Sequence, residues 1–474
     1  MLHHRLTPKL AAPLIGLTLV LAGCGSSGAG SGSANTAAAA FPDHPLVYVT
    51  VNLDQGSSAW KTARSVLSRL PSGQKAVARL AREMQSSSGG FAANVEPWIG
   101  SQAAFAVTGV DVGNPRAPVD VAGYVGVRDE GALESALAHK HVAKTGSDGD
   151  FTLYRMPGGR AFAAVGQGAL LASNSRATLH HQIDLLSGGA GSLADDAAFQ
   201  QQMAALPDGS LVEVWADLHQ VAGLASLASM GGAGSGADPA ALAKMASALS
   251  KAGTLTGSLG ADAHGFRLTL NTSGTSGKTP LGPPALISHV PANAFAYIGG
   301  NLRAPGHLAL PRLPGLTSDP QAARLLANLL PLFDGSVAAY AAPGMPVTGA
   351  LLSQPADQAA AARAARRLAR MANRTSPTPI SAHRAGGLVV LSNDPHAGAV
   401  ATSGLASSPA FESAAQAAGL PTSVGFLAYV GFPQIVKSLP QVGSNPDARH
   451  LGGLLVWTTR DAAGSHLVAY LQIN

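Results

Sequence analysis

The most reactive side chain in the sequence belongs to Cys24, the only cysteine among 474 residues. A thiol is the best nucleophile available in a protein for forming a thioether bond. Cys24 follows an apolar stretch at residues 10–22, and the residues before that stretch include Arg5 and Lys9 but no acid. Thirteen apolar residues suit the central region of an export signal, whereas a membrane-spanning helix needs about 20. The sequence therefore predicts an export signal that ends at the cysteine.

The residues that lead up to the cysteine are Leu21, Ala22 and Gly23, an aliphatic residue followed by two small ones. The segment resembles the lipobox of bacterial lipoproteins. The resemblance implies that Cys24 receives a diacylglyceryl group and that the chain is cut before it, whereas the alternative is an ordinary secretion signal with an incidental cysteine. Two acyl chains hold a protein stably on a membrane. We therefore expect a lipid-anchored protein at the outer face of the cytoplasmic membrane, with no free thiol left for disulfides or catalysis.

The segment after the cysteine, residues 25–40, reads GSSGAGSGSANTAAAA. Gly, Ser and Ala in this proportion are typical of a flexible coil with an end-to-end distance of about 20–25 Å. We predict a short spacer over residues 24–40 between the membrane and the folded part.

Two adjacent carboxylates, Asp195 and Asp196, could form an acid–base pair. A similar segment later in the chain has Ser407 and Ser408 at these positions, followed by Pro409. Asp and Ser share the ability to cap a helix N-terminus, and Pro is favoured at the first helical position. We therefore interpret both pairs as helix caps.

A second acidic pair, Glu213 and Asp217, falls on the same face of a predicted strand as Trp215. These residues could line an enzyme site, although a sheet face that is half in water explains them equally well. The common Gly-x-Ser-x-Gly and His-Glu-x-x-His motifs are missing from the sequence. We expect no enzyme, and an unrecognised site near Glu213 and Asp217 is the alternative.

Histidine is the remaining candidate for metal binding. His139, His141, His180 and His181 lie in the first part of the chain, and Asp184 follows His180 by one helical turn. A site would need three ligands that converge, with further groups to orient them. We expect solvated surface histidines, no metal and no other cofactor.

A cationic stripe runs along the predicted helix 357–373. It consists of Arg363, Arg366, Arg367, Arg370 and Arg374, which fall within about 100° of one another around the helix. Alanine, leucine and methionine occupy the other side. The stripe could be a solvated outer face. It could also face anionic lipid or an anionic wall polymer, where each basic charge near an anionic membrane is worth about 1 kcal/mol.

The overall charge excludes one class of partner. The formal net charge is +5, and removal of Arg5 and Lys9 with the signal leaves +3 (29 basic against 26 acidic residues). That excess is too small to indicate nucleic-acid binding. With 46% apolar residues, the long mature chain can form a substantial core in more than one domain.

Segments of the sequence recur in the same order, which predicts a tandem duplication. The matched pairs are 42–53 with 291–302, 170–175 with 389–394, 193–199 with 405–411, and 214–222 with 428–436. We place the two halves at residues 41–271 and 285–474. The Gly/Pro/Ser/Thr-rich segment 272–284 is the predicted linker, and residues 1–23 are the signal peptide.

Strand and helix signals alternate within each half. Helices are predicted at 57–70, 129–138 and 357–373, and strands at 102–110, 119–127 and 210–218. Hairpins are predicted at 256–271 and 453–473. This pattern favours an α+β fold of two repeated halves, each a largely antiparallel sheet with packed helices.

The opening strand ends in Asn52-Leu53-Asp54, and a helix start reads Leu-Ala-Asp-Asp-x-x-Phe from Leu193 to Phe199. These motifs resemble a family of actinobacterial exported proteins known only as a domain of unknown function. The resemblance implies no activity. We expect a non-enzymatic binding or scaffold protein of the envelope, with an unknown protein partner. The alternative is a carrier that holds a lipid or another apolar ligand in a cavity formed by the two halves.

Overall fold

The computed structural model describes residues 33–85, 95–110, 119–156, 158–159, 161–223, 246–247, 249–274, 281–302, 330–374, 378–399 and 403–474. They fall into two compact units. The first unit takes the described residues up to 68 and those from 72 to 214, and the second takes 69–71 and those from 215 onward. The boundary lies within strand β8 (Val212–Asp217).

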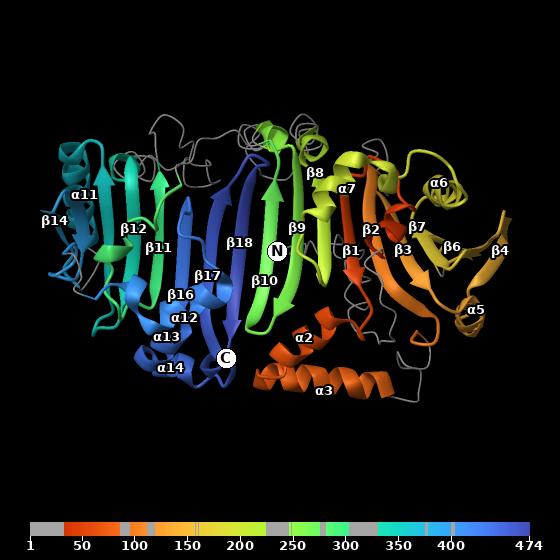
Figure 1. Ribbon diagram of the computed structural model, residues 1–474, viewed down its shortest axis with the longest axis horizontal. Helices are drawn as coiled ribbons and strands as arrows, with labels where there is room; N and C mark the ends of the chain where they lie inside the picture. Colours follow the sequence, from red (N-terminus) through yellow and green to blue (C-terminus); the bar gives the residue numbers. More distant parts are fainter. Residues whose placement is uncertain are drawn as a thin grey trace, which may run out of the picture. The chain divides into compact units, whose positions relative to one another are not determined.

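The first unit contains a run of antiparallel strands in the order β4-β5-β6-β7-β3-β2-β1 (Figure 1). The strands are β1 (Val47–Asn52), β2 (Ile99–Val110), β3 (Val119–Val127), β4 (Ala143–Asp148), β5 (Phe151–Arg155), β6 (Phe162–Gly166) and β7 (Ala169–Ser173). The helices are α1 (Ser33–Ala38), α2 (Ser58–Leu67), α3 (Pro71–Gln85), α5 (Glu130–His139), α6 (Arg176–Leu186), η2 (Leu193–Asp195) and α7 (Ala197–Ala204).

The second unit contains antiparallel strands in the order β14-β15-β13-β12-β11-β16-β17-β18-β10-β9. The strands are β9 (Thr254–Asp262), β10 (Gly265–Thr272), β11 (Ala296–Leu302), β12 (Gly335–Ala342), β13 (Thr348–Pro355), β14 (Ser381–Ala385), β15 (Leu388–Ser392), β16 (Phe426–Gly431), β17 (Leu451–Arg460) and β18 (Ser465–Ile473). The helices are η3 (Ile287–His289), η4 (Leu330–Phe333), α11 (Gln358–Ala372), η5 (Leu405–Ser407), α12 (Pro409–Ala418), α13 (Phe432–Ser438), α14 (Pro440–Gly443) and η6 (Asp447–Arg449).

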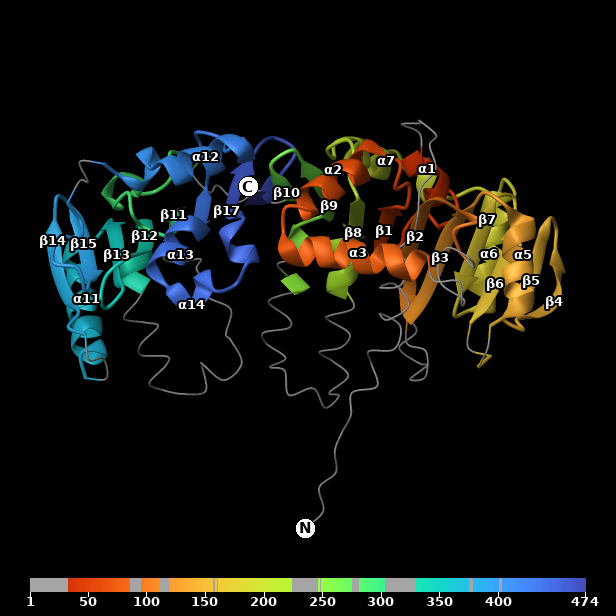
Figure 2. The same cartoon turned by 90° about the horizontal axis from the view of Figure 1, so that it is seen from below.

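The core of the second unit lies under α12. A cross-strand row of large side chains runs over five neighbouring strands, made of Tyr340, Tyr297, Tyr429, Leu455 and Tyr470. All five are buried. Phe411 of α12 packs edge-on against Tyr429, with ring centroids 5.1 Å apart, a favoured aromatic arrangement. Figure 2 shows α12 on one side of these strands and α13 and α14 on the other.

The prediction of two repeated halves, each with its own sheet, is wrong. The strands of the described residues belong to one 18-stranded sheet. The hairpin β9–β10, which was assigned to the first half, pairs along eight residues of β10 with β18 at the end of the chain. The compact units therefore divide within β8 and not at residues 272–284. Each strand of a hairpin leaves an unpaired edge, and the sequence of the hairpin does not specify which other strand completes that edge.

The local elements agree with the sequence. Helices α2, α5 and α11 are capped by Ser57, Asp129 and Asp357. The side chain of each cap accepts a hydrogen bond from a backbone N–H in the first turn. The hairpin turns fall at residues 263–264 and 461–464, within the two predicted hairpins. The local signal for these helix starts is a short side chain that can accept a hydrogen bond, followed by apolar residues at helical spacing.

Part of the predicted spacer at residues 24–40 belongs to the folded protein. Residues Ser33–Ala38 form helix α1, and Ala37, Ala38 and Ala40 are completely buried. Phe41 then packs edge-on against Tyr48, with ring centroids 5.4 Å apart. Alanine has the highest helix propensity and fits closely packed sites, so the Ala-rich end of the segment joins the fold.

Candidate binding surfaces and the lipid attachment residue

The predicted lipid attachment residue Cys24, with Leu21, Ala22 and Gly23, lies outside the described residues. The described part of the chain begins with α1, and residues 25–32 lie between Cys24 and this helix in the sequence. That length of chain reaches at most about 30 Å when fully extended. None of the helices in the described ranges combines the length and the apolar character that crossing a bilayer demands.

The paired carboxylates serve as structural groups. Asp196 caps α7, because its Oδ1 accepts hydrogen bonds from the backbone N–H groups of Ala198 (2.8 Å) and Phe199 (3.3 Å). Asp195 accepts a hydrogen bond from the hydroxyl of Ser192 at 2.7 Å. In the second unit, Ser408 caps α12, and Pro409 takes the first helical position, which confirms the predicted role of this segment.

Glu213 and Asp217 both lie on β8, but the two carboxylates have different surroundings. Asp217 Oδ1 accepts hydrogen bonds from the backbone N–H groups of His219 (2.9 Å) and Gln220 (3.1 Å), so it caps the turn after the strand. Glu213 is half-buried, and this burial raises its pKa, with a further contribution from the negative charge of Asp208. Trp215 is 4% exposed, which places its ring in the core.

The candidate metal ligands do not converge in the structure. His180 contacts the carboxylate of Asp148 through Nδ1, and His139 Nδ1 lies 2.8 Å from the carbonyl oxygen of Ser135 one turn earlier in α5. His141, at a positive φ of 54°, ends the turn after α5 and is exposed, and His181 lies beside His180 on α6. Within the described part of the chain, no three His, Cys, Asp or Glu residues form a group that could hold a metal ion.

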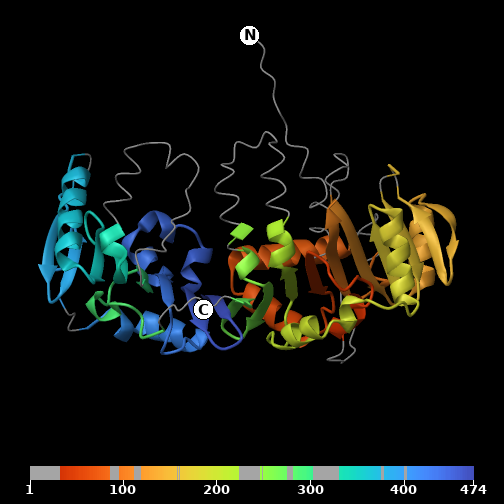
Figure 3. The ribbon, with the colours of Figure 1, turned by 90° about the horizontal axis from the view of Figure 1, so that it is seen from above.

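The arginine stripe occupies the exposed face of α11. The helix itself lies beside β14 and β15 (Figure 3). The five arginines Arg363, Arg366, Arg367, Arg370 and Arg374 are all exposed. On the opposite side, Ala361, Ala365 and Leu368 are buried against Leu332 and Val389. The helix is amphipathic as predicted, and its outer face is strongly cationic. Met371, the methionine expected on the apolar side, is instead 44% exposed.

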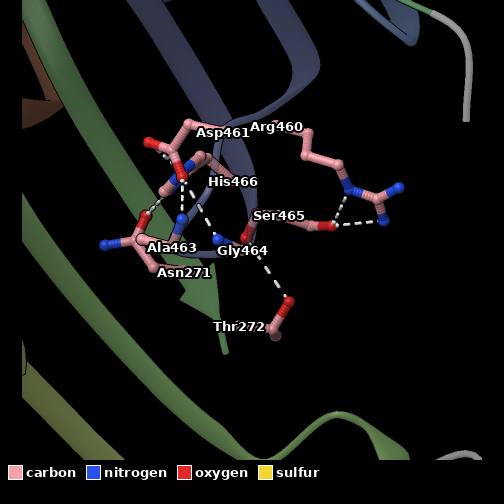
Figure 4. Close-up of polar contacts among 8 residues, drawn as sticks. All are labelled: Asn271, Thr272, Arg460, Asp461, Ala463, Gly464, Ser465 and His466. Atoms are coloured by element: carbon pink, nitrogen blue, oxygen red, sulfur yellow. Dashed lines mark hydrogen bonds and ion pairs between the residues drawn. The ribbon is translucent and has the colours of Figure 1, made fainter. Parts of the chain in front are cut away.

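A polar cluster joins β10 to the turn between β17 and β18 (Figure 4). His466 Nδ1 lies 2.8 Å from Oδ1 of Asn271, and His466 Nε2 lies 3.0 Å from a carboxylate oxygen of Asp461. The other oxygen of Asp461 accepts hydrogen bonds from the backbone N–H groups of Ala463 (2.8 Å) and Gly464 (3.1 Å). These contacts lower the pKa of Asp461, the one with His466 most strongly. The cluster fixes the turn, where Gly464 has a φ of 155°.

A family model described as a protein of unknown function, DUF3352, matches residues 10–375. The chain belongs to this family. The predicted resemblance to a family without an assigned activity is thus confirmed. No curated protein matches the sequence.

Solved structures give only distant similarity to this DUF3352 member. Three crystal forms of TP0453, forms IV, III and I, share 10%, 9% and 9% sequence identity with it. The matches cover 50%, 51% and 51% of this chain and 79%, 80% and 80% of theirs, with TM-scores of 0.28, 0.28 and 0.27. Similarity at this level carries no functional argument.

An apolar row crosses the sheet face opposite α12 in the second unit of this DUF3352 member. The row consists of directly paired residues, in order Leu259, Leu268, Ala469, Val456, Ala428, Ile298, Ala339 and Leu351. Ile298 is 49% exposed, Leu268 38% and Leu259 37%. The sequence does not predict this row. Alternation within one strand shows which residues share a face, but it does not show which residues of eight strands stand opposite one another.

A second surface that the sequence analysis missed is the hairpin turn between β12 and β13. It reads Pro-Gly-Met-Pro-Val at residues 343–347, without a charged or hydroxyl side chain. Met345 is fully exposed and Val347 is 40% exposed. The absence of polar side chains from a turn is the signal that could have identified it, since turns are usually polar.

Proposed function

We propose that this chain is an extracytoplasmic lipoprotein of actinobacterial type, held on the outer face of the cytoplasmic membrane through a lipid on Cys24. There it acts as a non-enzymatic binding or scaffold protein of the cell envelope. The observation that carries the proposal is the segment Leu21-Ala22-Gly23-Cys24, which contains the only cysteine and follows the apolar stretch 10–22.

The start of the folded part supports this arrangement. Helix α1 begins at Ser33 and packs into the first unit, so eight residues lie between the cysteine and this helix. Two acyl chains on Cys24 would hold the protein stably at the membrane surface. A short connection would then keep the folded units close to that surface.

The roles of the candidate catalytic groups favour binding over catalysis. Asp196 and Asp217 accept hydrogen bonds from backbone N–H groups at the starts of helical turns, and His180 is paired with Asp148. A general acid or base must be free to reach a substrate. These side chains are instead engaged locally.

Metabolic labelling tests the lipid attachment. Cells expressing the full chain are grown with radioactive palmitate, and we expect label on the wild type and none on Cys24→Ser. The matched control is the double variant Cys24→Ser/Ser26→Cys, which keeps a thiol two residues further on and should also stay unlabelled. Label on Cys24→Ser, or none on the wild type, would overturn the proposal.

A second candidate function is transport or storage of a lipid or another apolar ligand. The apolar row favours it, because its residues Leu259, Leu268 and Ile298 are exposed, and exposed apolar side chains in one patch mark binding sites. Native mass spectrometry of the chain from Gly25, purified gently, should then show an adduct of lipid mass. Ile298→Asp should lose that adduct, whereas Leu281→Asp, at an exposed leucine outside the row, should retain it. A clean apo mass for the wild type would remove this candidate.

A further inference from the structure

Exposed apolar side chains gather at one end of the second unit. The described residues include seven large apolar side chains that are exposed, and Met345, Val347 and Met371 are three of them. Met345 and Val347 lie in the β12–β13 turn, and Met371 lies in the last turn of α11 at 44% exposure. These residues are separate from the apolar row.

A chain of contacts places the end of α11 beside that turn. Asn373, which ends α11, exchanges hydrogen bonds with the backbone of Ile380, donating to its oxygen at 2.9 Å and accepting from its N–H at 2.6 Å. The next residue, Ser381, pairs with Ser392 at the end of β15. The residue after that, Asn393, donates from Nδ2 to the oxygen of Val347 at 2.9 Å. The C-terminal end of α11 and the apolar turn therefore lie at the same end of the sheet.

Basic side chains surround the exposed methionine of α11. Arg367 and Arg374 lie one turn before and one turn after Met371, and Arg370 precedes it. All three arginines are exposed. Arginines at a helix C-terminus favourably complement its dipole, but that effect is confined to the last turn and does not explain Arg363 and Arg366.

Of the three acids in the described residues between 330 and 399, Asp334 precedes β12 and Asp357 precedes α11, so Asp394 is the one at this end of these elements. Its Oδ1 accepts the backbone N–H of His396 at 2.9 Å, and it also interacts with the Tyr340 hydroxyl. The end of the unit is therefore cationic as well as apolar. We call this surface the cationic apolar end. It consists of Met345, Val347, Met371 and the five arginines of the stripe.

We propose that the cationic apolar end docks on a bilayer that carries anionic lipid headgroups, with Met345 and Met371 entering the interface and the arginines meeting the phosphates. This inference deepens the proposed function by assigning a membrane-contacting surface to the folded part. A lipid surface fits better than a soluble anion, because it offers apolar and anionic contacts side by side. Arginine is suited to phosphate because its planar guanidinium donates in a bidentate manner, and methionine because its flexible side chain adapts to irregular apolar surroundings.

The test uses the chain from Gly25, which retains every described residue and lacks both the signal and Cys24. Flotation with vesicles of equal parts phosphatidylglycerol and phosphatidylcholine should show binding, and pure phosphatidylcholine should show little. The variant Arg370→Gln/Arg374→Gln should weaken binding at least tenfold, since each basic group near an anionic surface accounts for about a fivefold change. The control Lys251→Gln/Lys437→Gln removes the same charge from other exposed positions of the second unit. It should change binding by less than about threefold.

Insertion of the turn has its own readout. The chain from Gly25 has no cysteine, so Met345→Cys and Met371→Cys provide unique sites for an environment-sensitive fluorophore. Emission from both should shift to the blue when the anionic vesicles are added, and Leu281→Cys should not shift. The proposal is overturned if the wild type does not bind these vesicles, if the arginine and lysine variants behave alike, or if a glycerol phosphate polymer binds in place of the vesicles. Palmitate labelling of Cys24 is independent of these results, so the two proposals fail separately.

Discussion

Arg267 lies over the ring of Tyr470, with its guanidinium carbon 5.0 Å from the ring centroid. The same guanidinium donates a hydrogen bond through Nη2 to the carbonyl oxygen of Ala418, the last residue of α12, at 2.8 Å. Tyr470 in turn donates its hydroxyl to Asp262 Oδ1 at 2.8 Å. One cationic side chain of β10 therefore joins β18 and the C-terminal end of α12, where a positive charge is favoured.

Replacing Arg267 with alanine should destabilise the second unit by about 2–3 kcal/mol. The estimate combines the loss of a cation–π contact with the loss of a charged hydrogen bond to a helix carbonyl. Arg267→Lys keeps the charge but not the planar group, so we expect an intermediate loss. Hydrogen exchange measured on peptides of β10 and β18 would check this prediction, and unchanged protection in Arg267→Ala would contradict it.

The helix caps provide a second prediction, one in each unit. Asp196→Ala and Ser408→Ala should each cost about 1 kcal/mol, because each leaves N–H groups of a first turn without their acceptor. Asp196→Ser exchanges one good cap for another and should cost much less. Urea unfolding of the three variants tests this, and a similar loss for Asp196→Ser would show that the charge of Asp196, rather than its acceptor, is what stabilises α7.

Local structure could be predicted from the sequence because it depends on residues close together in the chain. The caps at Asp129 and Asp357, the amphipathic α11 and the turn before Gly464 all follow from short-range rules. Helix α1 was missed because composition alone made its segment a linker, although Ala37 and Ala38 are small enough to pack completely.

Long-range pairing could not be predicted in the same way. The β9–β10 hairpin was placed correctly, but its union with β18 depends on which strand edges remain open after the rest of the chain has folded. The cationic half of the cationic apolar end was visible as a helical stripe. Its apolar half was not, because the turn that carries Met345 is separated from α11 in the sequence. The contacts of Asn373 and Asn393 bring that turn and the end of α11 to the same end of the sheet.

Glu213 should make stability fall as the pH rises. Burial raises the pKa of Glu213 in the folded state, so the folded protein holds this proton more tightly than the unfolded chain. The carboxyl contributes fully to stability below its pKa in the unfolded chain, about 4.3. That contribution is lost as the pH rises through its pKa in the folded protein. Glu213→Gln should therefore melt at a higher temperature than the wild type at pH 7, and the difference should close near pH 4.

A catalytic role for Glu213 would give a different pattern from this one. The same variant would then be more stable and also lose an activity, whereas a purely structural carboxyl changes stability alone. Melting curves between pH 4 and pH 8 are the measurement. A lower melting temperature for Glu213→Gln at pH 7 would show that the carboxylate is stabilised by contacts that outweigh its burial.

Asp461 should have the opposite pH dependence. Its contact with His466 lowers the pKa of Asp461, so this pair contributes stability above the unfolded value of about 3.9 and loses it as the pH falls through the folded pKa. Asp461→Asn keeps an oxygen that can accept from Ala463 and Gly464 and removes only the charge. Because Asp461 is exposed, the loss at pH 6 should stay below about 1 kcal/mol and shrink in high salt.

A double-mutant cycle with His466→Gln separates this pair from the rest of the turn. If the ion pair accounts for the effect, Asp461→Asn should cost little in the His466→Gln background. His466 also contacts Asn271 of β10, so His466→Gln alone should cost more than Asp461→Asn and should raise hydrogen exchange in β10. Equal effects of Asp461→Asn in both backgrounds would mean that the turn is held by its backbone hydrogen bonds and that His466 serves only to join the turn to β10.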